Sequence, residues 1–158
     1  MKKLLMTLLP LLAAAACTPA GTGTGQLVHT TSGTQPVAFN WRADDSTTGS
    51  LTAALPGGKL YKGRYVQITE RISGTALTPL WEGWDEGWTS WPDVDPNGNT
   101  DFGRHYTHRV VANLTSPDGG RMRCRFDLNS RANGMSGGGK GECQLLSGGV
   151  IEAVFPSD

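Results

Sequence analysis

Alternation of apolar and polar positions along this chain predicts several short β-strands. The clearest case is the segment 121–128, whose apolar positions are Met122, Cys124, Phe126 and Leu128, separated by Arg121, Arg123, Arg125 and Asp127. Successive side chains of a strand point to opposite faces, so a period of two predicts a strand with one buried face. Cys124 falls on that buried face.

Comparable strand-like runs occur before and after this segment, and Gly- or Pro-containing turns such as Pro56–Gly58 and Ser116–Gly120 separate many of them. Together with 121–128 they predict about seven short strands. The expected fold is therefore all-β: a small antiparallel meander-type barrel or sandwich, as a single domain over 37–158. The alternation of apolar and polar positions stops over 73–104, and this interruption predicts one long insertion loop. The further runs are Val37–Trp41, Leu51–Leu55, Leu60–Ile72, His108–Leu114, Glu142–Leu146 and Ile151–Phe155.

Composition supports the all-β prediction and excludes one class of function. Glycine makes up 22 of 158 residues, which disfavours long helices and favours turns. Lys and Arg number 14, as do Asp and Glu, so the formal net charge is zero. Nucleic-acid binding through a basic surface needs an excess of positive charge, and we expect no nucleic-acid partner.

The first 16 residues have the layout of a secretory signal peptide. Met1–Lys3 is basic, and Leu4–Ala16 is apolar but too short to span a bilayer. The end of this run, Leu12–Cys17, resembles the lipobox of bacterial lipoproteins, in which the peptide is cut before a Cys that then carries acyl chains such as palmitate. We therefore expect a lipid anchor at Cys17, the alternative being a soluble exported protein cut near Ala16.

Residues 17–36 are predicted to be the lipidated Cys followed by a flexible tether. Thr18–Gly25 is polar and rich in Gly, and eight such residues reach about 15 Å as a coil. The residue after the Cys is Thr18. In Gram-negative bacteria, an Asp at this position acts as a retention signal, and Thr does not. The resemblance thus implies a cell-envelope protein at the outer membrane, facing the periplasm and attached to the membrane through its lipid.

Cys124 and Cys143 are the two remaining cysteines. Export places them in an oxidising compartment, and a Gly-rich loop separates the two predicted strands that carry them. These two strands form a predicted hairpin, across which we expect a disulfide. The alternative is a pair of buried free thiols.

Four tryptophans gather in the long insertion, namely Trp81, Trp84, Trp88 and Trp91. Tryptophan is rarely exposed in such a group without a reason. Three roles fit: a cap over one end of the β domain, a platform on which sugar rings or peptides stack, and contact with a lipid surface. If the loop binds a partner, we expect cell-wall glycan or another envelope protein.

A calcium loop is a weaker possibility in the same insertion. Asp93, Asp95, Asn97 and Asp101 occupy oxygen-ligand positions of an EF-hand loop, but Arg104 stands where the closing Glu should be. The alternative is a solvated turn, which Asp, Asn, Pro and Gly favour. Apart from this structural calcium, we expect no cofactor and no metal.

Other short motifs predict structure rather than chemistry. The segment 134–141 contains G-x-S-x-G around Ser136, but Gly residues follow where a hydrolase needs a helix. It also contains G-x-x-x-x-G-K, but Gly141 stands where a phosphate loop needs Ser or Thr. We therefore expect a loop with positive φ or close backbone approach. His105 and His108, three positions apart on a strand, point to opposite faces and cannot share a metal.

The C-terminal third carries a resemblance to a family. Its pattern runs from Met122-x-Cys-x-Phe through 134–143 to Ile151-x-Ala-x-Phe, and it resembles a family of small uncharacterised bacterial exported proteins and lipoproteins. The resemblance implies an all-β envelope domain and no particular activity. We expect a non-catalytic binding or structural module. The alternative is a small periplasmic hydrolase that uses carboxylates such as Glu82, Asp85 or Asp101.

Overall fold

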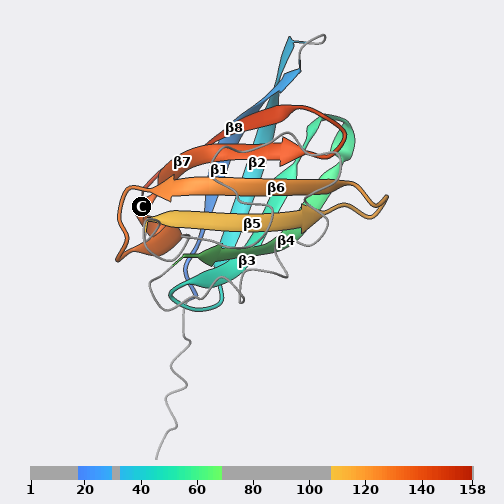
Figure 1. Cartoon of the computed structure of the whole chain (residues 1–158). Helices are drawn as coiled ribbons and strands as arrows, with labels where there is room; N and C mark the ends of the chain where they lie inside the picture. The colour runs from blue at the N-terminus through green and yellow to red at the C-terminus, as the bar shows by residue number, and fades with distance from the viewer. Residues whose placement is uncertain (1–17, 30–32, 69–107, 158) are drawn as a thin grey trace, which may run out of the picture.

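The computed structural model describes residues 18–29, 33–68 and 108–157, which form a closed antiparallel barrel (Figure 1). Each strand pairs with its neighbour in the sequence, and the last strand pairs with the first. The all-β meander is confirmed, and closure identifies a barrel rather than a sandwich. The strands are β1 (Ala20–His29), β2 (Gly33–Ala43), β3 (Thr48–Ala54), β4 (Leu60–Gln67), β5 (Arg109–Thr115), β6 (Arg121–Leu128), β7 (Gly139–Leu145) and β8 (Val150–Phe155).

Helical structure in these three ranges is limited to two short 3-10 turns, Pro56–Gly58 and Gly134–Gly137. Within the same ranges, no helix is long and apolar enough to cross a membrane. The predicted strands correspond to β2–β8, with shifts of a few residues at their ends. The largest shift concerns the run Leu60–Ile72, because β4 ends at Gln67.

The interior of the barrel is filled by side chains at alternate strand positions. In β6, Met122, Cys124 and Phe126 are buried inward, as the period-two pattern predicted. Phe126 meets the ring of Phe155 edge-on at a centroid distance of 4.9 Å, and Phe39 lies 5.6 Å from Phe155. An eight-stranded barrel is just wide enough for side chains to fill, so this cluster of rings forms the core.

The predicted tether over residues 17–36 is wrong for most of its length, because Ala20–His29 forms β1. This strand pairs with β2 along its whole length and with β8 from Thr24 to Val28. Its Gly positions point inward, where the neighbouring strands carry large rings: a Cβ at Gly21 would lie 2.7 Å from Trp41 Nε1, and one at Gly23 2.5 Å from Phe155 Cδ1. The alternation of Gly and Thr is therefore a strand pattern, and the domain begins at β1 rather than at residue 37.

The disulfide between Cys124 and Cys143 is confirmed. The two residues are direct partners in the register of β6 and β7, and both are fully buried. The bond therefore links two strands across the hairpin inside the core.

The loop between β6 and β7 closes one end of the barrel. Gly138 has φ +70°, a conformation that glycine adopts without steric cost, and Met135 is buried against the core. The expected loop ends at Gly138, because Gly139–Leu145 is strand β7. The predicted close approach of two backbones is found at Gly141, because a Cβ there would lie 2.0 Å from the Arg125 carbonyl oxygen.

Replacement of Leu27 tests the assignment of β1 to the barrel. Leu27 is 2% exposed inside the core, so we expect Leu27→Ala to lower the free energy of unfolding by about 2–5 kcal/mol. The matched control is Val28→Ala, because Val28 is the next residue, is 45% exposed, and should change stability by less than about 0.5 kcal/mol. The measurement is denaturant unfolding. Equal, small effects of the two substitutions would support a tether.

Candidate functional site

Most site residues predicted from the sequence lie outside the described residues. This applies to the lipid-attachment residue Cys17, to Trp81, Trp84, Trp88 and Trp91, to the calcium candidates Asp93, Asp95, Asn97 and Asp101, and to Glu82, Asp85 and His105. Across the described ranges, no group of three or more His, Cys, Asp or Glu side chains is arranged to hold a metal ion.

Two of the singled-out residues are described. His108 is exposed where the chain enters β5, and its carbonyl oxygen accepts a hydrogen bond from the Leu128 N–H. Ser136 lies in the turn Gly134–Gly137. The position of Ser136 agrees with the loop that the sequence predicts over part of 134–141.

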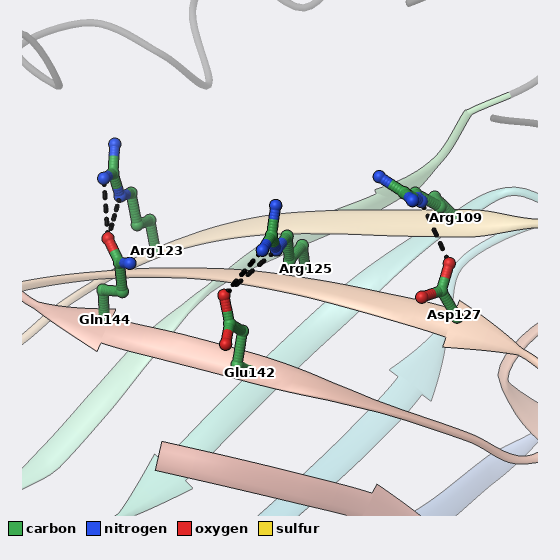
Figure 2. A network of polar contacts seen from close by, with 6 residues as sticks. All are labelled: Arg109, Arg123, Arg125, Asp127, Glu142 and Gln144. Atoms are coloured by element: carbon green, nitrogen blue, oxygen red, sulfur yellow. Dashed lines mark hydrogen bonds and ion pairs between the residues drawn. The ribbon is translucent and has the colours of Figure 1, made fainter. Parts of the chain in front are cut away.

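The most distinctive surface of the described chain is the outer face of β5–β7, which is rich in arginine. Three arginines each contact the residue directly opposite on the neighbouring strand (Figure 2). Arg109 Nε lies 3.0 Å from Asp127, Arg125 donates to Glu142 at 2.8 and 3.1 Å, and Arg123 donates to the Gln144 side-chain oxygen at 2.6 and 3.0 Å. Cross-strand pairs of this kind stabilise a sheet and hold the guanidinium groups on one side of it.

Part of this outer face is buried although it points away from the core. Arg123 is 3% exposed and Gln144 6%, and Arg is almost never so fully buried unless it is paired. Loss of water, together with the neighbouring positive charge of Arg125, lowers the pKa of Arg123 to about 10. We call Ile68, Val111, Arg123 and Gln144 the covered face, because Ile68 and Val111 are also buried and do not belong to the core cluster.

A hollow of about 430 Å³ lies beside the covered face, over β5–β8. Its walls carry both cations and carboxylates, namely Arg109, Arg125, Lys140, Asp127, Glu142 and Glu152. Asp127 and Glu142 are each engaged by an arginine. This mixture suits contact with a polar surface of mixed charge better than selection of a single anion.

The barrel end formed by the β3–β4 and β5–β6 turns carries a second polar cluster. Lys59 Nζ lies 2.9 Å from Asp118, and the Ser116 hydroxyl donates to the same carboxylate. Two hydrogen bonds lower the pKa of Asp118 to about 2, and the one from Ser116 has a larger effect than the one from Lys59. These contacts fasten two turns together, which is a structural role.

The arginine-rich face was not predicted from the sequence. A signal was present, because Arg121, Arg123 and Arg125 occupy alternate positions of a predicted strand and therefore share its outer side. Three like charges in a row are costly on one face unless partners offset them. The alternation of arginines is therefore a signal that predicts paired partners on the neighbouring strands.

Comparison with known proteins finds two distant structural likenesses and no relative in sequence. No protein-family model matches the chain, and no curated protein matches it. Among solved structures, a redesigned β-barrel is 11% identical with a TM-score of 0.46, covering 87% of this chain and 90% of its own. A second redesigned barrel, mFAP1 bound to DFHBI, is 12% identical with a TM-score of 0.43, covering 86% and 93%. Neither likeness bears on function.

The pair Arg125–Glu142 should contribute more to stability than an exposed ion pair. Its side chains are 25% and 33% exposed, against 62% and 46% for Arg64 and Asp44. A double-mutant cycle with Arg125→Ala and Glu142→Ala should give a coupling of about 0.5–1 kcal/mol. The same cycle on Arg64 and Asp44 should give a value near zero, because water screens that pair. Equal couplings would contradict this ranking.

Proposed function

We propose that this chain is a lipid-anchored protein of the bacterial cell envelope that acts as a binding or structural module rather than as an enzyme. The signal-peptide pattern and the lipobox-like run ending at Cys17 support the anchor. A disulfide in the core fits an oxidising compartment. Thr18 after the Cys favours the outer membrane, with the barrel facing the periplasm.

The burial of Arg123 is the observation that supports a docking function best. An outward-facing arginine at 3% exposure, with Val111 buried beside it, is typical of a surface on which another element packs. We propose that the occupant is residues 69–107 of the same chain. This segment is 39 residues long and joins β4 to β5, so both its ends start beside the covered face. At those ends, the Ile68 N–H donates to the Arg109 carbonyl oxygen at 2.8 Å.

Charge complementarity favours the same occupant. Residues 69–107 contain seven carboxylates and two arginines, whereas the outer faces of β5 and β6 carry Arg109, Arg121, Arg123 and Arg125. Opposite charges of this kind set the register of a contact and disfavour wrong partners. The apolar side chains of Ile68 and Val111 would add a hydrophobic component.

In this proposal the barrel is a rigid support for the element that meets the partner. The contact residues would be Trp81, Trp84, Trp88 and Trp91, with cell-wall glycan or another envelope protein as the partner. Tryptophan rings stack on sugars and peptides and are favoured at interfaces. A structural calcium bound by Asp93, Asp95, Asn97 and Asp101 stays a prediction for the same segment.

The alternative remains a small periplasmic hydrolase using Glu82, Asp85 or Asp101. Only the residue type supports it, since separated carboxylates are common on protein surfaces. Hydrolysis of an envelope polymer by the purified chain would favour this alternative over a binding module.

Loss of the lipid anchor on Cys17→Ser is the first test. Cells grown with labelled palmitate should incorporate label into the wild-type chain and into the Cys124→Ser/Cys143→Ser control, but not into Cys17→Ser. The Cys17→Ser protein should also leave the membrane fraction, because two or more acyl chains are needed for stable attachment. Label that survives in Cys17→Ser would contradict the anchor.

Proteolysis of the full chain tests docking on the covered face. Trypsin can cut residues 69–107 only at Arg71 and Arg104. A carboxylate in Arg123→Glu would repel the acidic segment, so we expect cleavage there to accelerate roughly tenfold, as for about 1.4 kcal/mol of lost docking free energy. Arg123→Gln should give a smaller increase.

The matched control for this experiment is Arg64→Glu, which changes the same charge at an exposed site of β4. Its cleavage rate should equal that of the wild type. Denaturant unfolding identifies any variant whose barrel is lost, and size-exclusion chromatography tests whether a second copy covers the face instead. Equal rates in Arg123→Glu and Arg64→Glu with an intact barrel would overturn the proposed docking.

A further inference from the structure

The start of the described chain is fastened to the barrel before β1 begins. The Ala43 N–H donates to the Pro19 carbonyl oxygen at 2.8 Å, and Arg42 Nε donates to the Thr18 hydroxyl at 3.2 Å. Ala20 is then the register partner of Arg42. The chain is therefore held on β2 from Thr18 onward.

This attachment leaves almost no free length between the lipid position and the barrel. Cys17 directly precedes Thr18, and consecutive Cα atoms are about 3.8 Å apart. A tether of about 15 Å would let the domain tumble at a distance from the surface. A separation of one residue instead brings the end of the barrel at which β1 begins against the lipid headgroups.

The parts of the chain that share this end follow from the strand directions. It carries the turn between β2 and β3 and the loop between β6 and β7 (Figure 1). The end of β4 and the start of β5, between which residues 69–107 run, lie at this end as well. Gln67 at the end of β4 joins these two connections, because its N–H donates to the Thr47 carbonyl oxygen at 2.6 Å and its side-chain amide donates to the Arg131 carbonyl oxygen at 2.9 Å. The opposite end carries Pro56–Gly58 and the turns Ser116–Gly120 and Leu145–Gly149.

We infer that the barrel stands on the lipid surface on the end formed by residues 44–48 and 129–138, with the opposite end facing away. This inference rests on the proposed anchor at Cys17. The partner surface is a phospholipid headgroup layer, and the barrel meets it in one fixed orientation.

The chemistry of this end indicates that the lipid anchor, not charge, holds it there. Asp44 is paired with Arg64 at 3.1 Å, and the Asp45 carboxylate accepts hydrogen bonds from the Thr47 and Thr48 N–H groups, both at 2.7 Å. The hydrogen bond from the Thr47 N–H, and after it the one from the Thr48 hydroxyl, lower the pKa of Asp45 to about 2, so it is negative at neutral pH. The exposed Arg131 of the β6–β7 loop offsets the charge of one carboxylate, so this end carries no excess of positive charge for anionic headgroups to attract. The orientation should therefore be the same on neutral and anionic bilayers.

Paramagnetic lipids in nanodiscs can test the orientation with the full lipidated chain. A spin label on the headgroups should abolish the amide NMR signals of Ser46, Thr47 and Asn133 and leave those of Gly57, Gly119 and Gly148. The two ends are roughly 20 Å apart, given strands of about eight residues tilted by about 40°. The pattern should be the same with neutral and anionic lipids.

The control inserts a Gly/Ser linker of about twelve residues, which reaches roughly 20 Å, between Cys17 and Thr18. The contrast between the two ends should disappear in this variant. Mass spectrometry of the same sample separates the two ideas. An unacylated chain would overturn the proposed anchor and the orientation with it. An acylated chain with equal signal loss at both ends, or with the opposite pattern, would overturn the orientation alone.

Discussion

Closure of the sheet by β1 is the constraint on which the rest of the barrel depends. An open sheet would leave β2 and β8 with unpaired edges, which are sites of aggregation. β1 pairs with both, and it can do so only because Gly positions face the rings of Trp41 and Phe155. The small side chains of one strand and the large ones of its neighbours thus fill a narrow interior together.

The same constraint explains which parts of the fold could be predicted from the sequence. Strands β2–β8 place apolar side chains inward, so alternation reveals them, and the buried position of Cys124 follows from its parity. In β1 the inward positions are mostly Gly, which adds nothing to a hydrophobic pattern. A short polar stretch that is rich in Gly, such as Thr18–Gly25, is then interpreted as a flexible linker. Its Thr and Gly residues nevertheless alternate with the period of a strand.

The candidate surface was harder to predict for a different reason. Charged side chains on an outer face are normally solvated, and the sequence of β6 does not distinguish exposed Asp127 from buried Arg123. Burial of Arg123 depends on what packs over the sheet, and that is a tertiary property. The cross-strand partners Glu142 and Gln144 follow from the register of the β6–β7 hairpin, which the sequence of β6 alone does not reveal.

Pairing of β1 with β8 also sets the order of events during folding. All other pairings join strands that are neighbours in the sequence, whereas this one joins residues 24–28 to 150–154. The hairpin that contains Cys124 and Cys143 is local and can form while synthesis continues. The barrel cannot close until the last strand, β8, has been synthesised. A chain truncated before β8 would therefore keep its disulfide but present two open sheet edges, those of β1 and β7, which are sites of aggregation.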